Sequence, residues 1–185
     1  MATNVKLRLG NLFDGPSDLI VLPCSTAGTI TGFVARSLVD YRIPHPRAGM
    51  RLGTVEFMPF GGAENIAQFV AFAASVEGYD STPEAIREIG RLVGAFTHEH
   101  PEVTAIAAPL LGAGAGGLHG EQVVAVLMEG FSENASKGAC LTISVLHQDV
   151  YERLRAGRRG WLVRPHASPG FSSVMRRERR RTKTG

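Results

Sequence analysis

Short apolar runs alternate with amphipathic segments along this chain, and the alternation predicts an α/β fold. Three short runs are mostly apolar, as in strands that are buried on both faces of a parallel sheet: residues 19–22, 104–108 and 141–146. In residues 84–96 and 121–132, apolar side chains instead recur every three or four positions, which predicts helices with one buried face. Strands that alternate with helices typically form a sheet against which the helices pack.

Two further strands are predicted before the first of these helices. Residues 53–59 and 65–73 are rich in apolar side chains and are separated by the Gly61-Gly62 turn. Thr82 and Pro83 then mark the start of the helix, because threonine is a favoured N-cap and proline a favoured first helical residue.

A loop of small residues lies between the apolar run at 104–108 and the helix at 121–132. Residues 109–118 read Pro-Leu-Leu-Gly-Ala-Gly-Ala-Gly-Gly-Leu. Glycines let the backbone approach an anion closely, and the loop N–H groups and the helix N-terminus supply partial positive charge. We therefore expect this loop to bind the ligand. The alternative is a tight turn that binds nothing.

The residues of this loop argue against two common phosphate-binding motifs. A P-loop needs Lys and then Ser or Thr after its last glycine, whereas Leu118 and His119 follow Gly117. Gly112, Gly114 and Gly117 match G-x-G-x-x-G, but a dinucleotide-binding domain carries that motif after its first strand. The position of the motif in the second half of the chain makes a Rossmann dehydrogenase a poor interpretation.

Another loop of similar composition lies earlier in the chain, after the apolar run at residues 19–22. We call it the first loop, and residues 109–118 the second loop or glycine loop. Residues 23–32 contain Ser, Thr, Ala and Gly, and a helical pattern begins near Phe33. Ligands in open α/β sheets bind outside the carboxyl ends of the strands. Two such loops are therefore expected to clamp a diphosphate from both sides.

Composition predicts one domain followed by a basic tail. The chain has 185 residues, 44% of them hydrophobic, which is enough for a sizeable core. Residues 153–185 contain 11 basic side chains and one acidic one, whereas residues 1–152 contain 9 basic and 16 acidic ones. We assign residues 1–156 to the domain and residues 157–185 to a tail that is disordered in isolation.

Other classes of function find little support in the sequence. No apolar run reaches the roughly 18 residues of a membrane span, and residues 1–10 lack the apolar core of a signal peptide. We therefore expect a cytoplasmic protein with no membrane partner. Cys24 and Cys140 do not form a disulfide framework, and the six histidines show no metal-ligand spacing. No metal and no cofactor are predicted.

Taken together, these motifs resemble the macro domain family, which binds ADP-ribose and related nucleotides. The resemblance covers residues 5–154. Residues 5–13 are similar to the family's first strand and Gly-Asp-Ile/Leu turn, and residues 19–25 to the strand that usually ends in Val-Asn-Ala-Ala-Asn. Residues 109–118 resemble the second ligand loop, commonly Pro-x-x-Gly-Thr-Gly-x-x-Gly. Residues 141–154 resemble the closing strand and helix.

The resemblance implies a three-layer α/β/α fold around a central mixed six-stranded sheet, and a cleft for ADP-ribose or an ADP-ribosylated macromolecule. It also implies that Asn11 accepts a hydrogen bond from the adenine amino group, that Leu12 supplies a backbone N–H and an apolar contact, and that His147 packs on the adenine. The two loops would enclose the diphosphate and the terminal ribose. The resulting candidate ligand-binding residues are Asn11, Leu12, Ser25, Thr26, Ala27, Gly28, Thr31, Gly32, Leu111, Gly112, Ala113, Gly114, Ala115, Gly116, Gly117, Leu118 and His147.

The sequence departs from the family's pattern where catalysis is concerned. Ser25 replaces the Asn that orients the terminal ribose in one enzymatic branch, and no acid occurs between Asp18 and Asp40. Another branch uses a Lys nucleophile with an Asp in the second loop, and neither ligand loop here contains a Lys or an Asp. We therefore assign no catalytic residue. Binding is favoured over efficient hydrolysis, with slow hydrolysis of an ADP-ribosyl group left open.

Three alternatives stay open at this point. The basic tail is able to bind nucleic acid or another acidic partner through counterion release. Asn11, in place of the adenine-reading acid, is also compatible with a sensor of another nucleotide. Cys24 lies beside a predicted helix N-terminus that lowers a thiol pKa, which leaves room for a thiolate assisted by His119 or His147.

Overall fold

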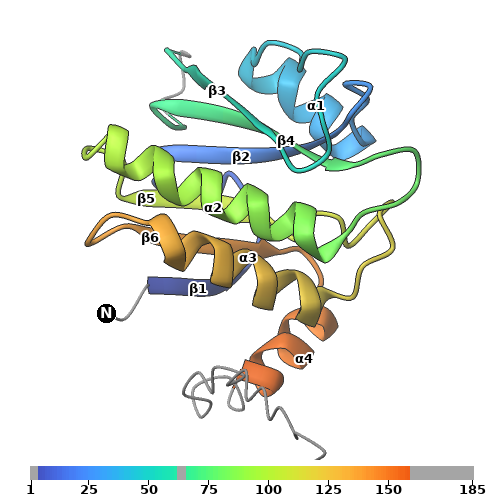
Figure 1. Ribbon diagram of the computed structural model, residues 1–185, viewed down its shortest axis with the longest axis vertical. Coiled ribbons are helices and arrows are strands. Elements are labelled where there is room, and N and C mark those ends of the chain that lie inside the picture. Colours follow the sequence, from blue (N-terminus) through green and yellow to red (C-terminus); the bar gives the residue numbers. More distant parts are fainter. Residues whose placement is uncertain (1–3, 62–65, 159–185) are drawn as a thin grey trace, which may run out of the picture.

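Six strands and four helices make up the part of the chain that the computed structural model describes, residues 4–61 and 66–158. In chain order they are β1 (Asn4–Leu9), β2 (Leu19–Ser25), α1 (Gly32–Tyr41), β3 (Val55–Pro59), β4 (Phe69–Val76), α2 (Pro83–Glu99), β5 (Ala105–Pro109), α3 (Gly120–Asn134), β6 (Cys140–Val145) and α4 (Gln148–Arg158). The strands form one sheet in the order β1-β6-β5-β2-β4-β3 (Figure 1). β3 is antiparallel to β4, and the other neighbouring strands are parallel. This confirms the predicted α/β fold with a mixed six-stranded sheet.

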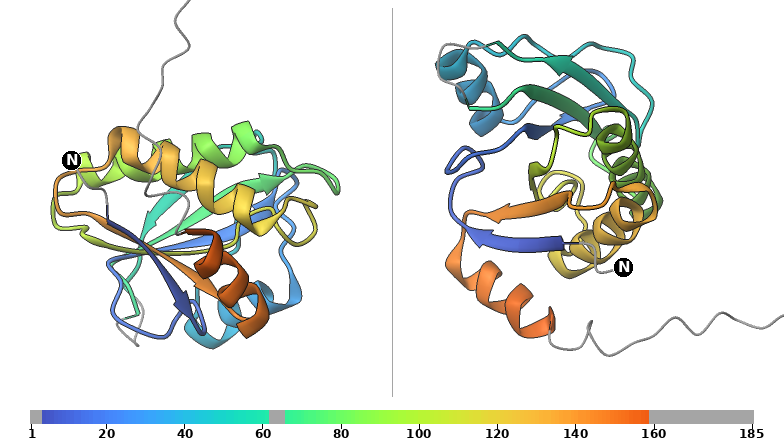
Figure 2. Two further views of the ribbon diagram at one scale, coloured as in Figure 1. Left: turned by 90° about the horizontal axis from the view of Figure 1, so that it is seen from below. Right: turned by 90° about the vertical axis from the view of Figure 1, so that its left-hand side faces the viewer.

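The helices cover both sides of the sheet (Figure 2). α2 and α3 run side by side across one face, α1 packs against the other face near β2 and β4, and α4 lies at the β1 end. Within the described residues, no helix combines the length and the apolar character that crossing a membrane requires. Most of the predicted tail, residues 159–185, lies outside the described residues.

The predicted elements are present, with their ends shifted by a few residues. The strand predicted at 65–73 is displaced at both ends and spans Phe69–Val76 as β4. In β2 the apolar run 19–22 predicts a short strand. The strand instead continues through Pro23 to Ser25, because its carboxyl half pairs with β4. The start of α2 is as predicted: Pro83 is the first helical residue, and Thr82 Oγ1 accepts a hydrogen bond from the Ala85 N–H (3.1 Å).

Alternate residues of β2 belong to two separate cores. Leu19 and Val21 pack toward α2 and α3, whereas Ile20, Leu22 and Cys24 pack toward α1. None of the five is more than 4% exposed. A strand buried on both faces explains why the sequence reads as a continuous apolar run rather than an alternating one.

Glycines allow α2 and α3 to approach each other closely. A Cβ atom at Gly130 would lie 1.9 Å from the carbonyl oxygen of Arg87, and one at Gly90 would lie 2.5 Å from that of Leu127. A Cβ at Gly94 would come within 2.7 Å of the Phe131 carbonyl oxygen. The two helix backbones are thus in direct contact, so any side chain at these positions forces the helices apart.

The amino ends of the two central strands are joined by one carboxylate. Asp18 Oδ2 accepts hydrogen bonds from the backbone N–H groups of Thr104 (2.9 Å) and Ala105 (2.8 Å), and Gln68 Nε2 donates to Oδ1 (3.2 Å). Burial alone would raise the pKa of Asp18, but these hydrogen bonds together hold it below its ordinary value. The carboxylate therefore fixes how β2 and β5 start relative to each other.

We expect Gly130→Ala to lower the free energy of unfolding by about 3 kcal/mol, because overpacking costs roughly 1–3 kcal/mol and this contact involves rigid backbone. Gly157→Ala, on the exposed side of α4, is the matched control, since a Cβ there meets no atom within 4 Å. That control is expected to gain about 0.5–1 kcal/mol from the better helix propensity of alanine. Chemical denaturation of the two variants and the wild type measures both effects, and equal midpoints would contradict the close packing of the helices.

Asp18→Asn is expected to destabilise the protein in a pH-dependent way. A carboxyl group whose pKa is lowered by folding stabilises the protein above its unfolded pKa, and that stabilisation is lost as the pH falls through the folded pKa. At neutral pH we expect a loss of about 1 kcal/mol, which allows for partial solvent screening. The difference from wild type should close as the pH falls below about 4. Denaturation curves from pH 2.5 to 7 test this, and a gap that does not vary with pH would refute the role of the charge.

Candidate functional site

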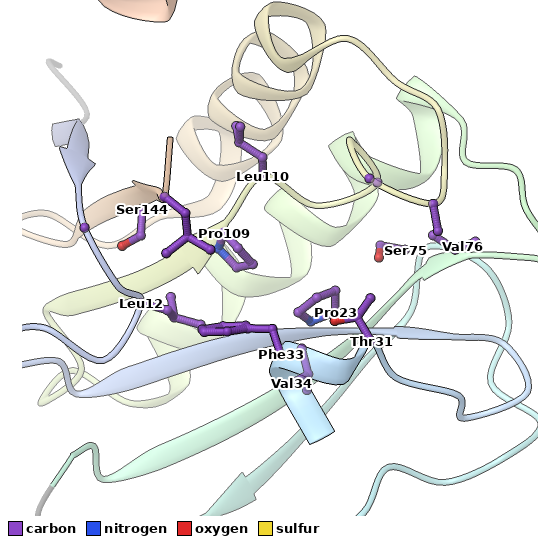
Figure 3. Close-up of a pocket in the computed structure, with 15 residues that line it drawn as sticks. Leu12, Pro23, Thr31, Phe33, Val34, Ser75, Val76, Pro109, Leu110 and Ser144 are labelled. Carbon is purple, nitrogen blue, oxygen red and sulfur yellow. The ribbon is translucent and has the colours of Figure 1, made fainter. Parts of the chain in front are cut away.

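The two central strands separate toward their carboxyl ends. The paired register of β2 and β5 covers only Leu19 with Ile106 and Ile20 with Ala107. Farther along, Pro23 of β2 and Pro109 of β5 have no N–H with which to continue the ladder. A pocket of about 290 Å³ lies where the strands diverge, and both prolines line it (Figure 3). We call this the central pocket.

Most of the central pocket is apolar. Leu12, Phe33 and Leu110 are among the side chains around it, and Figure 3 shows Phe33 extending from α1 toward Leu12. The full lining is Gly10, Leu12, Pro23, Thr31, Phe33, Val34, Ser75, Val76, Pro109, Leu110, Gly112, Gly114, Ala115, Ser144 and Leu146. No described residue of this lining carries a charge, and its polar side chains are three hydroxyls.

Two neighbouring pockets extend the central pocket into a groove along the carboxyl edge of the sheet. The hydroxyl pocket, about 190 Å³, shares five of its residues and is lined by Pro23, Cys24, Ser25, Thr29, Ile30, Thr31, Ser75, Val76, Gly78, Tyr79 and Ala115. The α4 pocket, about 750 Å³, is lined by Pro109, Leu110, Ala113, Gly114, Leu118, His119, Gly120, Glu121, Ser144, Val145, Leu146, His147, Val150 and Arg153. The groove therefore contacts both predicted ligand loops.

Part of the second loop lines the groove, and the rest of it packs against the core and against Ser81. Leu111 is 1% exposed and belongs to the core below, and Gly116 packs on Ser81. Gly112 has a φ of +74°, which favours glycine, and its carbonyl oxygen accepts a hydrogen bond from the Leu118 N–H (3.1 Å). Of the predicted ligand residues in this loop, those that line the groove are Gly112, Ala113, Gly114, Ala115 and Leu118; Leu111, Gly116 and Gly117 do not.

The first loop closes on itself through Ser25. Its Oγ accepts hydrogen bonds from the N–H groups of Ala27 (3.2 Å) and Thr29 (3.0 Å) and lies 2.6 Å from Thr29 Oγ1. Thr31 is the N-cap residue of α1, but within the described chain its side chain makes no capping hydrogen bond. Thr31 lines both the central and the hydroxyl pocket.

Four predicted residues of the first loop, Thr26, Ala27, Gly28 and Gly32, are absent from the described lining of the groove. A Cβ at Gly28 would lie 2.9 Å from the carbonyl oxygen of Arg47, and the Gly49 N–H donates to the Thr26 carbonyl oxygen (2.9 Å). The proline-rich segment after α1 thus supports the back of the loop. It does not line any of the three pockets among the described residues.

The turn after β1 is held by its own hydrogen bonds. Asn11 Oδ1 accepts from the Phe13 N–H (3.1 Å), and Asn11 N–H donates to Asp14 Oδ2 (2.8 Å). Arg8 Nη2 donates to the carbonyl oxygens of Asn11 and Leu12, at 3.1 Å each. Asn11 does not line the three pockets, whereas Leu12, 2% exposed, lines the central one. The side-chain carbonyl that was expected to read adenine is therefore engaged in the turn.

The histidine and cysteine candidates lie in different surroundings. His147 is exposed and lines the α4 pocket with His119, close to the Arg153–Glu121 ion pair (Nε–Oε1 3.0 Å). Cys24 is 4% exposed. Burial, with a smaller contribution from the carboxylate of Glu56, raises the pKa of the Cys24 thiol to about 11. The thiolate alternative is therefore wrong, because the thiol stays protonated near neutral pH.

Several residues that line the groove were not predicted from the sequence. Pro23 opens the first loop and Phe33 follows it. Ser75 lies two residues beyond the predicted strand 65–73, so the rule that ligands bind at the carboxyl ends of strands would have included all three. Ser144, at the end of β6, hydrogen-bonds to Arg8 Nη2 (3.1 Å). Within residues 4–61 and 66–158, no three His, Cys, Asp or Glu side chains are placed to hold a metal ion.

Comparison with known proteins finds likeness in structure only. No protein-family model matches the chain, and no curated protein does. The macrodomain of Mycobacterium tuberculosis DarG is 16% identical with a TM-score of 0.64, and the alignment covers 79% of this chain and 100% of that one. The macrodomain of Thermus aquaticus DarG is 18% identical with a TM-score of 0.60, covering 78% and 99%. The Trypanosoma brucei macrodomain in complex with ADP-ribose is 16% identical with a TM-score of 0.65, covering 83% and 68%.

We expect the Cys24 thiol to react slowly with alkylating reagents in the folded protein. In a Cys140→Ser background, the rate should rise about tenfold per pH unit from pH 7 to 9 without reaching a plateau, because the thiol pKa is about 11. The same variant unfolded in urea is the control, since an unperturbed thiol titrates near 8.5. Rapid alkylation of the folded protein at neutral pH would contradict the buried, protonated thiol.

Proposed function

From the macrodomain fold and the groove at the carboxyl edge of its sheet, we propose that the protein binds ADP-ribose, or an ADP-ribosyl group attached to a macromolecule. The observation that carries the proposal is the central pocket between the diverging ends of β2 and β5, which is continuous with the glycine loop and the start of α1. Binding is its main activity, and any hydrolysis is slow.

The central pocket suits a flat, uncharged ring. Leu12, Val34 and Leu110 surround it with apolar side chains, and Phe33 offers an aromatic face. A nucleobase buries apolar surface against such a lining and stacks on aromatic side chains. The Trypanosoma brucei macrodomain, which shares this fold, has been crystallised with ADP-ribose.

The diphosphate would be held by backbone groups rather than by cations. Gly112 and Gly114 bring the loop backbone to the edge of the central pocket, and Thr31 places the N-terminus of α1 there. N–H groups at a helix start and in a glycine loop bind anions without any basic side chain. The described lining of the central and hydroxyl pockets contains no Lys, Arg or His.

The same lining supports binding over turnover. The general base in hydrolysis is most often a carboxylate or a neutral His within hydrogen-bond reach of the attacking water. The described residues of the central and hydroxyl pockets include no Asp, Glu or His, and Cys24 is protonated near neutral pH. Any hydrolysis would depend on the substrate's own phosphate to orient water, with backbone N–H groups stabilising the developing charge.

Isothermal titration of the purified protein with ADP-ribose should give a dissociation constant in the micromolar range, with ADP, AMP and NAD as comparators. Gly114→Glu should abolish binding, because a carboxylate at the groove repels the diphosphate and fills its space. A Cβ at Gly114 meets no atom within 4 Å, so the variant is expected to fold. Gly157→Glu adds the same charge at another unobstructed glycine and should bind normally. Absence of heat with every nucleotide would overturn the proposal.

The nucleic-acid alternative rests on the basic tail, most of which lies outside the described residues. It stays a prediction from charge alone, as does the expectation that His147 packs on adenine. The central and hydroxyl pockets add no argument for nucleic acid, because their described lining has no basic side chain, and Arg153 of the α4 pocket is paired with Glu121.

A further inference from the structure

One buried hydroxyl in the groove has no partner. Ser75, near the end of β4, is 0% exposed, and its Oγ makes no hydrogen bond with any described residue. It lines the central pocket (Figure 3). It also lines the hydroxyl pocket, and therefore lies where the two pockets meet. A buried hydroxyl without a partner costs about 1–3 kcal/mol, so its retention at a pocket points to a ligand atom as the partner.

An irregularity in the pairing of β2 with β4 sets the direction of the Ser75 side chain. In the pairing of β2 with β4, Cys24 lies opposite Ala74 and Ser25 lies opposite Val76, which leaves Ser75 without a register partner. Such a bulge breaks the strict alternation of side chains and re-aims one of them, and bulges occur often beside binding sites. Ser75 consequently borders the groove instead of either core.

The other hydroxyls of the two pockets are engaged or lie at the surface. Ser25 and Thr29 bond to each other and to their own turn, and Ser144 accepts a hydrogen bond from Arg8. Thr31 is exposed at the start of α1. Ser75 is thus the buried hydroxyl of the described lining that is available to a ligand.

The surroundings of Ser75 favour a neutral group over a charged one. Pro23, Val76 and Ala115 adjoin it in both pockets, and the described lining there has no cation. A phosphate oxygen needs several N–H donors or a cation to offset its removal from water, and the single Ser75 hydroxyl offers neither. A sugar hydroxyl satisfies Ser75 by a neutral hydrogen bond and brings no charge with it.

We propose that Ser75 determines ligand specificity: its hydroxyl hydrogen-bonds a hydroxyl of the sugar beyond the diphosphate, so the groove prefers ADP-ribose to ADP. The proposal rests on the proposed function, because it assumes that ADP-ribose occupies the groove. It adds the residue that distinguishes a nucleotide with a terminal sugar from one without it.

The test compares the affinities for ADP-ribose and ADP in the wild type and in Ser75→Ala. We expect the affinity for ADP-ribose to fall about tenfold, equivalent to about 1.4 kcal/mol, while that for ADP is unchanged. The thermal midpoint of the ligand-free variant should stay the same or rise, because a buried hydroxyl without a partner has been removed. Ser75→Cys, nearly the same size with a weak donor, should show the same selective loss.

Thr97→Val is the matched control. Thr97 is 0% exposed, and its hydroxyl donates to the Gly94 carbonyl oxygen (2.7 Å) and accepts from the Ser136 N–H (2.8 Å). Removing this hydroxyl should lower the thermal midpoint and leave both affinities unchanged. The two variants are thus expected to differ in the sign of the stability effect as well as in binding.

The remaining outcomes distinguish failure of the Ser75 assignment from failure of the proposed function. An equal loss of affinity for ADP and ADP-ribose, or no loss for either, would overturn the assignment of Ser75, as would a lower thermal midpoint in Ser75→Ala. If the wild type binds neither nucleotide, the proposed function itself fails and the Ser75 assignment fails with it. Binding by the wild type with an unchanged preference in the variant refutes the Ser75 assignment alone.

Discussion

The separation of β2 from β5 is the constraint on which the rest of the groove depends. At their amino ends the Asp18 carboxylate ties the two strands together, and the paired register then ends after two residues on each. Farther along, Pro23 and Pro109 cannot donate to a neighbouring strand. The carboxyl ends therefore lie apart, and each continues into a loop of small residues that leads to a helix. A cleft with a backbone-lined rim follows from that geometry.

The groove is polar through its backbone and apolar through its side chains. The glycine loop and the uncapped start of α1 provide N–H donors, while Leu12, Phe33 and Leu110 provide the apolar surface. This division suits a ligand that combines a neutral ring with a diphosphate, because neither part requires a charged side chain. The described lining of the central and hydroxyl pockets also lacks the carboxylates and histidines that most often serve as general acids and bases, so the features that favour binding there oppose rapid hydrolysis. The groove's His119, Glu121 and His147 line the α4 pocket instead.

The sequence predicts the fold and both loops well, because apolar runs and glycine clusters are local signals. It does not predict which loop residues border the groove. Ser25 looks like a ligand hydroxyl by position, yet it bonds to Thr29, and Asn11 bonds within its own turn. Such local hydrogen bonds compete with ligand contacts and depend on backbone geometry that periodicity does not encode. The role of Ser75 likewise depends on the bulge between β2 and β4, which arises only when the strands pair.

The two helices on one face of the sheet are tightly packed, whereas the carboxyl edge of the sheet holds buried hydroxyls that lack hydrogen-bond partners within the described part of the chain. Gly90, Gly94 and Gly130 bring α2 and α3 into backbone contact, which leaves that layer little freedom to move. At the carboxyl edge, by contrast, Ser75 and Ser81 both keep a buried Oγ without a partner among the described residues, and Ser81 lies directly under the glycine loop. Unpartnered buried polar groups lower stability and persist only where the surrounding structure holds them. Of the two, Ser75 lines the groove, so a ligand there is able to supply the hydrogen bond that its hydroxyl lacks, whereas Ser81 supports the glycine loop from below and is not among the described residues that line the three pockets.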